Sequence, residues 1–442
     1  MLETQPSNAT DQKSLNAFLL RKLMPLLILV YVISFLDRAN IALAKHAMGI
    51  DLGISAAAYG FGAGIFFLTY AAFEIPSNLI MHRVGARLWI TRIMITWGIL
   101  SIGMGFVNGE TSFYVMRLLL GAAEAGLFPG VMLYLTYWFG RNERARATGY
   151  FLLAVCFASI IGNPLGGALL EMDGFMGFHG WQWLFVIEGL PAVVVAFVVY
   201  RLLPDRPSNA RWLSTADASA IESRLAAEQE SIARPDGEHS FRTCLTDPQV
   251  WLAILVYFCH QITVYTVIYF LPSIIGASGN YSPFTIGLLT TIPWIAAAIG
   301  SVVVLRFANS SSRSRLLLGI GLLCMAAGML IAAYSAPVIG LLGICLAASM
   351  FYVVQSIIFT FPSSRLSGGA LAGGLALVNT CGQRGGFVGP TVIGMVEYTT
   401  GKAINGLGFL AIALVVGAVF SRRLRHGNED VDPSHGEATR AI

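Results

Sequence analysis

Residues 23–44 read LMPLLILVYVISFLDRANIALA, an apolar stretch long enough to cross a lipid bilayer as one helix. Its charged side chains are the adjacent Asp37 and Arg38, which lie well inside the stretch. A charge near the bilayer centre costs about 3 kcal/mol on insertion scales, so such residues usually face a watery cavity and serve a function. The pair therefore marks both a membrane helix and a candidate site.

A second long apolar stretch has the same character. Residues 113–139 read FYVMRLLLGAAEAGLFPGVMLYLTYWF and carry one charge of each sign, Arg117 and Glu124. Two helical turns separate these residues, which places both on one helix face about 10 Å apart. That distance is too long for a direct ion pair unless the side chains reach toward each other or share a water molecule or a substrate.

Composition assigns the whole chain to the membrane. Hydrophobic residues make up 56% of the 442 positions and charged residues 12%, against about 25% charged residues in a typical soluble domain. Apolar stretches of about 20 residues recur, and no segment shows the apolar–polar alternation of a membrane β-barrel. We therefore expect an all-α membrane protein with twelve transmembrane helices, at 23–45, 56–80, 88–107, 112–138, 145–170, 182–203, 249–274, 284–307, 314–335, 338–362, 370–396 and 403–421.

Lysine and arginine are distributed unevenly between the two sides of the expected membrane domain. The segments after even-numbered spans and both ends of the chain carry nearly all of them, whereas the opposite loops carry Lys45 and Lys402. Because positive residues stay inside, both termini and the central loop are predicted to be cytoplasmic. This bias also accounts for the net charge of +4, so no nucleic-acid partner is predicted.

A polar segment divides the chain into two halves. Residues 204–247 carry charges of both signs and separate a six-helix half at 1–203 from a second six-helix half at 248–442. A cytoplasmic connector between two such halves is the layout of transporters that bind their substrate between structural repeats, near the membrane midplane. The sequence therefore favours a secondary transporter that works by alternating access.

Other classes of function lack their sequence signals. No GxxxxGK[S/T] phosphate loop is present, so a nucleotide-driven pump is not predicted. The six cysteines are scattered singly, without metal-ligand spacing, and no enzyme motif is present. We therefore expect neither an enzyme, nor a channel, nor a metal site.

Several motifs extend the argument beyond composition. They are FLDRANIALA at 35–44, RLLLGAAEAG at 117–126, WQWLF at 181–185 and GGFVGP at 385–390. Together they resemble the major facilitator superfamily, and more narrowly its anion:cation symporter family. The resemblance implies the major facilitator fold in a bacterial inner membrane. It also implies proton-coupled import of a small organic anion, such as a hydroxy-carboxylate, a dicarboxylate, a sugar acid or an aromatic acid.

The resemblance also implies which small partners to expect. The proton is the coupling ion, no other cofactor is expected, and the protein is expected to be a monomer. The family assigns Asp37 and Glu124 to proton coupling, which agrees with their chemistry, because a desolvated carboxyl near an arginine can change its protonation when a ligand arrives. The alternative is structural: Asp37 balances Arg38 at a packed interface, and Glu124 forms a fixed ion pair between helices.

Two arginines and a tyrosine are candidates for binding the substrate. Arg38 and Arg117 present planar forks of donors that match a carboxylate and stay charged when dehydrated. Tyr70 matches a position that the family uses for hydrogen bonding to the substrate. We therefore predict that Arg38, Tyr70 and Arg117 contact the anion.

Polar residues in the second half form two pairs at helical spacing. Gln261 and Tyr265 are four residues apart in one span, and Asn379 and Gln383 are four apart in another. Such side chains suit a ligand with hydroxyl or carbonyl groups, although membrane helices also use amides to join one another. We predict that all four contact the substrate.

Arg384 departs from the family pattern, in which this position is usually apolar. On an ideal helix it points about 100° away from Gln383. It either makes a second cationic contact in the cavity, pairs with Glu74 or another acid, or extends toward the headgroups. We favour the cavity contact, which would select dianions.

The direction of transport is open on sequence grounds. An antiporter or exporter of organic anions or drugs on the same fold is the alternative function. Paired arginines favour anions over cationic drugs, but they do not set the direction.

Overall fold

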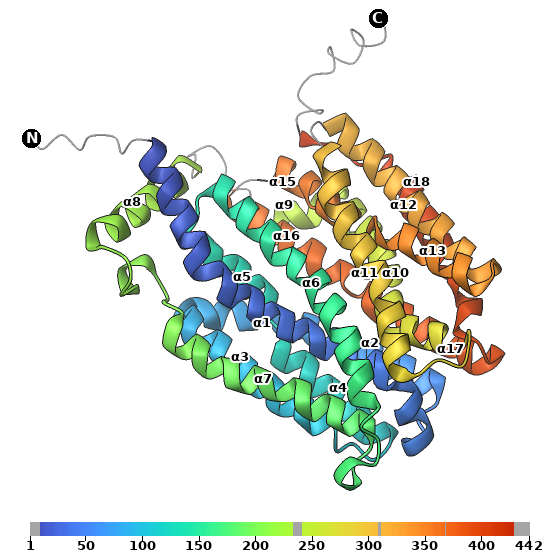
Figure 1. Ribbon diagram of the computed structural model, residues 1–442. Coiled ribbons are helices and arrows are strands. Elements are labelled where there is room, and N and C mark those ends of the chain that lie inside the picture. The colour runs from blue at the N-terminus through green and yellow to red at the C-terminus, as the bar shows by residue number, and fades with distance from the viewer. Residues whose placement is uncertain (1–8, 233–240, 308–310, 367, 428–442) are drawn as a thin grey trace, which may run out of the picture.

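The computed structural model describes residues 9–232, 241–307, 311–366 and 368–427, and its regular elements are helices (Figure 1). The first half contains α1 (Ala9–Leu52), α2 (Ala56–Val84), α3 (Ala86–Met104), α4 (Glu110–Glu124), α5 (Leu127–Thr136), α6 (Arg141–Leu170), η1 (Phe175–Gly177) and α7 (Gly180–Leu202). The connecting segment contains η2 (Pro207–Asn209), α8 (Thr215–Ile232) and α9 (Phe241–Thr246). The second half contains α10 (Pro248–Gly276), α11 (Pro283–Val304), η3 (Leu305–Phe307), α12 (Ser311–Tyr334), α13 (Pro337–Ala348), α14 (Phe351–Ile358), α15 (Thr360–Arg365), α16 (Gly368–Gly382), α17 (Gly385–Thr400), η4 (Ala403–Gly406) and α18 (Leu407–Ser421).

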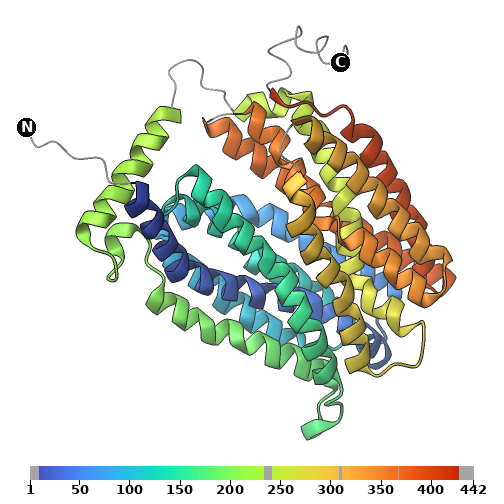
Figure 2. The same ribbon diagram turned by 45° about the horizontal axis from the view of Figure 1, so that its top comes forward.

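The first residues of α1 and the last residues of α18 lie on one side of the helical bundle (Figure 1). We call this the proximal side, and the side of the loops at 53–55, 171–179, 277–282 and 401–402 the distal side. Helix α8 is also proximal and packs on the first half in both views (Figures 1 and 2), whereas α9 packs on α16 of the second half. Trp212 lies 5.6 Å from the Phe18 ring and 5.7 Å from the Trp138 ring, centroid to centroid.

Local signals set where several helices begin on each side. On the distal side, Ser55 accepts from the Ala58 amide at 3.1 Å and starts α2. On the proximal side, Asp247 caps α10, and the proline that follows it occupies the first helical position. A side-chain acceptor at the N-cap satisfies an amide that has no partner within the helix, and proline fits the next position because no donor is needed there.

The all-helical fold and its membrane spans confirm the prediction from the sequence. Within the described ranges, ten long helical segments are apolar enough to cross a membrane. The two other expected spans correspond to α3 and to the pair α16–α17. Arg87 and Arg92 lower the hydropathy of α3, and the other span is divided into two helices of 15 and 16 residues. For these reasons neither α3 nor the pair α16–α17 meets a single threshold on helix length and hydropathy.

Two spans are interrupted close to candidate site residues. In the fourth span α4 ends at Glu124, and Gly126 has a φ of +91°, which favours glycine. A Cβ atom at Gly126 would lie 2.1 Å from Ser77 Oγ, so neighbouring α2 also requires glycine there. In the eleventh span α16 ends at Gly382 and α17 begins at Gly385. Interrupted helices near the midplane are typical of transporter binding sites.

Glycines allow the two halves to approach closely. A Cβ atom at Gly60 of α2 would lie 2.3 Å from the Pro390 carbonyl oxygen of α17. A Cβ atom at Gly287 of α11 would lie 2.2 Å from the Asn163 carbonyl oxygen of α6. Small residues at such crossings bring backbones together in membrane proteins. The interface between the halves therefore depends on backbone contact along the pairs α2–α17 and α6–α11.

Candidate functional site

A cavity lies between the two halves and is lined by both. In the first half its wall consists of Tyr31, Phe35, Arg38, Tyr70, Phe128, Leu152 and Val155; in the second half it consists of Gln261, Val264, Tyr265, Ile268, Tyr352, Gln355, Asn379 and Gln383. The wall thus combines aromatic and aliphatic surface with a small number of polar groups. This composition is typical of a site for a small molecule.

Six of the predicted substrate residues line this cavity. They are Arg38, Tyr70, Gln261, Tyr265, Asn379 and Gln383. Their side chains come from α1, α2, α10, α16 and the break after α16, which lie far apart in the sequence. The fold therefore brings together the candidates that the sequence identified separately.

Arg38 is paired with Glu124. Arg38 Nε donates to Glu124 Oε1 at 2.9 Å, and Nη2 lies 2.9 Å from the same oxygen. Ser34 also donates its hydroxyl to Glu124. Glu124 is fully buried and Arg38 is 6% exposed. The pair is a charge-assisted contact between the first and fourth spans, with its cation on the cavity wall.

This pairing differs from the partners that sequence proximity suggested. Asp37 does not balance the neighbouring Arg38; it accepts a hydrogen bond from Ser101 of α3 and lies outside the cavity wall. Consecutive helix residues point about 100° apart, so Arg38 turns to the cavity while Asp37 turns into the first half. Glu124 likewise pairs with Arg38 of α1, and not with Arg117 of its own helix.

Arg117 lies outside the cavity wall. Its Nε donates to the Gly62 carbonyl oxygen at 3.1 Å, and Nη2 donates to the Ala63 carbonyl oxygen at 3.0 Å. Nη2 also reaches the hydroxyl of Tyr269, in the second half, at 3.4 Å. Arg117 is 2% exposed. In this conformation the predicted contact with substrate is replaced by contacts that join α4, α2 and α10.

The amides of the second half face both the cavity and the first half. Gln261 Nε2 donates to Gln383 Oε1 at 3.3 Å across α10 and the eleventh span. Asn379 Nδ2 donates to Glu74 Oε1 of α2 at 2.8 Å, and Thr380 donates to Glu74 Oε2 at 3.1 Å. Asn379 therefore has two surroundings, the cavity and a contact between the halves.

Arg384 does not reach the cavity, so the favoured cavity contact is wrong for this conformation. Its side chain is exposed, and the wall includes Gln383 but not Arg384. The suggested partner Glu74 is bound by Asn379 and Thr380 instead. The rotation of about 100° between successive helical residues explains the outcome, even though the helix is interrupted at this point.

Several cavity residues were missed in the sequence. Tyr31 and Phe35 are seven and three residues before Arg38, so helical spacing places them on the same face. Tyr31 stacks on Phe151 with ring centroids 4.2 Å apart. Spacing relative to Arg38 was therefore a usable signal. Tyr352 and Gln355, in the tenth span, have no charged neighbour in the sequence that would have drawn attention to them.

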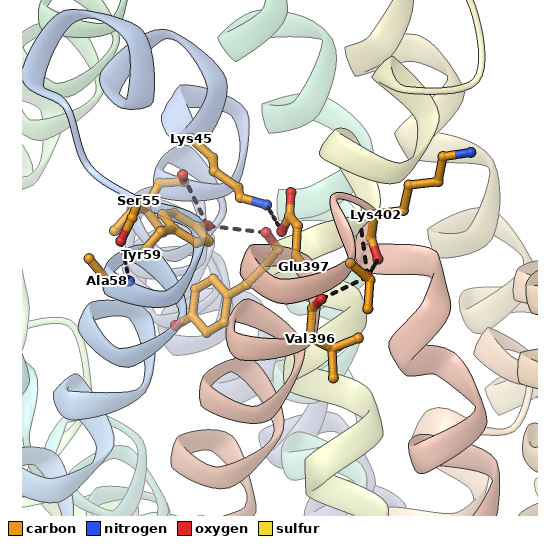
Figure 3. Close-up of polar contacts among 10 residues, drawn as sticks. Lys45, Ser55, Ala58, Tyr59, Val396, Glu397 and Lys402 are labelled. Carbon is orange, nitrogen blue, oxygen red and sulfur yellow. Dashed lines mark hydrogen bonds and ion pairs between the residues drawn. The ribbon is translucent and has the colours of Figure 1, made fainter.

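On the distal side, an ion pair joins the two halves. Lys45 of α1 points toward Glu397 of α17 and forms a salt bridge with it (Figure 3). The Lys45 ammonium also lies 4.3 Å from the centre of the Phe270 ring. Beside this pair, the Tyr59 hydroxyl donates to the carbonyl oxygens of Ile41 at 3.2 Å and Tyr269 at 3.1 Å. These contacts join the two halves on the distal side.

Comparisons with known proteins agree with this architecture. The sequence profile described as Major Facilitator Superfamily matches residues 27–390. A protein of Agrobacterium vitis named "Putative tartrate transporter" is 41% identical over 416 residues, covering 92% of this chain and 91% of the relative. A "Quinolone resistance transporter" of Acinetobacter baumannii is 37% identical over 404 residues, covering 90% and 92%. The crystal structure of a D-xylose–proton symporter superposes with a TM-score of 0.74 at 15% identity, covering 92% of this chain and 98% of that one.

Proposed function

Because the chain belongs to the Major Facilitator Superfamily, we propose that this multi-pass membrane transporter imports a small organic anion together with protons. The proposed substrates are hydroxy-carboxylates, dicarboxylates, sugar acids or aromatic acids. The name of the Agrobacterium vitis relative supports the first two classes. The observation that carries the proposal is the placement of Arg38, which brings a guanidinium to the wall of a cavity shared by both halves.

The Arg38–Glu124 pair provides a mechanism for coupling. A substrate carboxylate that approaches Arg38 competes with Glu124 for the same donors, which lie 2.9 Å from Glu124 Oε1. Protonation of Glu124 removes its negative charge and weakens its hold on Arg38. Proton binding therefore favours anion binding, and loss of the proton restores the internal pair and releases the anion. A carrier in which each ligand promotes binding of the other is a symporter.

Asp37 extends this coupling into the first half. It accepts a hydrogen bond from Ser101 of α3, and in α1 it directly precedes Arg38, the partner of Glu124. A change in its protonation alters the contact between the first and third spans. We propose that Asp37 is the second proton-coupling residue, whose state depends on the rearrangement of α1 when the anion binds.

The remaining polar wall supplies specificity. Tyr70 and Tyr265 offer hydroxyl groups, and Gln261, Asn379 and Gln383 offer amides that donate and accept. These groups suit hydroxyl or carbonyl substituents on a carboxylate. The aromatic wall beside them suits the apolar face of the same molecule.

The membrane orientation follows from charge. The proximal side carries the arginine-rich segments, so we propose that it faces the cytoplasm of a bacterial cell. The contacts on the distal side then correspond to a conformation closed to the outside. Alternating access requires these contacts to part while the proximal ends of the halves approach each other.

A proton electrode tests the proposal directly. Purified protein in liposomes is given an inward gradient of L-tartrate or gluconate, and the external pH is recorded. Symport predicts alkalinisation outside with at least one acid, and none in liposomes without protein. Substrate flux without proton movement, or outward proton movement, contradicts the proposal.

An exporter is the second candidate function. The Acinetobacter baumannii relative is named for quinolone resistance, and it covers most of this chain. The same electrode separates the two functions, because an exporter driven by the proton gradient moves protons against the direction of its substrate. A quinolone added to one side of the liposomes is the matched probe.

A further inference from the structure

Glu188 of α7 is a buried acid that the proposed coupling mechanism does not use. Glu188 is 2% exposed, and within the described part of the chain neither of its carboxyl oxygens has a hydrogen-bond partner at normal distance and angle. The neighbouring polar groups are the Asn40 amide and the Asp37 carboxyl, both from α1. The Asn40 amide nitrogen is also without a partner there. The Asn40 amide and the Glu188 carboxyl thus lie next to each other in the interior of the first half.

Charge accounting in the first half requires one neutral acid. The buried acids of the first half are Asp37, Glu74, Glu124 and Glu188, and its buried cations are Arg38, Lys45 and Arg117. Lys45 pairs with Glu397 of the second half, and Glu74 accepts from Asn379 and Thr380, so three acids remain with two arginines. Arginine keeps its charge when buried. Glu124 is bound by Arg38, and Asp37 accepts from Ser101 and lies within electrostatic reach of Arg117. Among the described residues Glu188 has no cationic partner, and a buried carboxylate without one is strongly unfavourable. In this conformation the proton therefore belongs on Glu188.

The helices around Glu188 offer no competing cation among the described residues. From α1 it meets Asn40 and Asp37. From α6 it meets Gly166, where an added Cβ atom would lie 3.6 Å from Glu188 Oε1. Helix α3 packs along α7. Its polar side chains in this region are Ser101 and Trp97, and both of them interact with Asp37. Asp37 is consequently the titratable group with which Glu188 can exchange a proton.

Depth in the membrane places Glu188 before Asp37 on a path from the distal side. Glu188 is eight residues from the distal start of α7 at Gly180, or roughly 12 Å along the helix. Asp37 is fifteen residues from the distal end of α1 at Leu52, or roughly 22 Å. The Arg38–Glu124 pair lies at about the same depth as Asp37, beside the cavity. Glu188 is therefore nearer to the distal side than Asp37 and Glu124.

We propose that Glu188 is a third proton-binding residue of the transport cycle, which receives protons from the distal side and passes them to Asp37. In this step the O–H bond of the Glu188 acid breaks, and the carboxylate of Asp37 accepts the proton. Glu188 is left as a carboxylate and is neutralised by the next proton from the distal side. The inference rests on the proposed proton coupling and extends it to a residue outside the cavity.

The test compares E188Q with the parent protein in liposomes, using L-tartrate accumulation driven by a pH gradient. Glutamine reproduces the shape of the neutral acid but cannot release a proton. With a gradient of one pH unit, each coupled proton supports about tenfold accumulation, because that gradient equals about 1.4 kcal/mol. We expect E188Q to lose about tenfold in accumulation and to lose its response to external pH. Tartrate counterflow, which needs no net proton movement, should stay within about twofold of the parent.

A matched control and a second variant keep the outcome decisive. E110Q makes the same chemical change at an exposed acid near the distal end of α4 and should accumulate tartrate like the parent. Parent-like accumulation and pH response in E188Q would overturn the inference and leave Glu188 a permanently neutral packing group. If E188Q is thermally destabilised, E188D must restore the pH response, since it keeps the acid; failure to do so also overturns the inference.

The inference and the proposed function fail differently. If the parent protein moves no protons with any acid tested, the proposed coupling itself is refuted. If the parent protein couples protons and E188Q couples them equally well, the role of Glu188 is refuted and the coupling by Glu124 stands.

Discussion

Replacing Lys45 by methionine should open the distal side of the transporter. The Lys45–Glu397 pair joins α1 to α17, and its side chains are 8% and 20% exposed. Removing one partner of a fully buried pair costs 3–5 kcal/mol. Water reaches Glu397 in part and lowers this cost, so we expect a loss of about 2 kcal/mol from the closed conformation. The open conformation does not contain the pair and is unaffected.

This loss is large on the scale of a conformational equilibrium. About 2 kcal/mol changes the ratio of closed to open molecules by about 30-fold. Spin labels at Ile50 and Tyr398, which are 70% and 66% exposed near the distal ends of α1 and α17, report the separation of the halves. The native cysteines are first replaced. Pulsed spin-resonance measurements on K45M should show a longer distance population that is minor in the parent.

Two controls isolate the ion pair. Lys402 lies at the same end of the molecule, is exposed and points away from Glu397, so K402M removes a nearby positive charge without breaking the pair (Figure 3). Its distance distribution should match the parent. The double exchange K45E/E397K should recover part of the closed population. An unchanged distribution in K45M would refute the view that this contact holds the distal side closed.

Four further predictions concern the cavity and its coupling. E124Q should retain counterflow of the transported acid but lose pH-driven accumulation, and concentrative uptake by this variant would remove Glu124 from coupling. D37N should show the same separation of counterflow from accumulation, measured with radiolabelled substrate, whereas equal loss of both would indicate a structural role. R38K should raise the substrate Kd by about tenfold or more, because an ammonium cannot replace the bidentate guanidinium fork and a hydrogen bond to a charged group contributes about 1.5–3 kcal/mol. Parent-like binding by calorimetry would show that the substrate carboxylate binds elsewhere. R384L should change the KM for dicarboxylates less than twofold, because its side chain lies off the cavity wall; selective loss of dianion transport would return Arg384 to the site.

The sequence was most informative where the signal was local. Hydropathy located the spans because each must bury about 20 residues in lipid. Helical spacing also paired Gln261 with Tyr265 and Asn379 with Gln383, and all four line the cavity. The rotation between neighbouring residues correctly separated Arg384 from Gln383, although the favoured interpretation set that argument aside.

Partners from other helices were not predictable in this way. Glu124 bonds to Arg38 from a span 86 residues earlier in the chain. Arg117 bonds to two backbone carbonyls of α2, an acceptor that no side-chain pattern reveals. Both contacts depend on how closely α1, α2 and α4 approach, and that approach depends on packing, as Gly126 against Ser77 illustrates.

The interruption of the fourth span connects the coupling pair to the movement of the halves. Glu124 is the last residue of α4, and the chain turns at Gly126 before α5 begins at Leu127. The Glu124 carboxylate therefore lies where the span has no continuous backbone hydrogen bonding, so α4 and α5 can change their relative angle at low cost. Ion pairing with Arg38 holds this joint to α1, and in the proposed mechanism protonation or substrate binding releases it. The same joint packs against α2 through Ser77, and α2 meets α17 backbone to backbone at Gly60. A change at one carboxylate thus reaches the interface between the halves through three helices in direct contact, which is the physical connection that coupled transport requires.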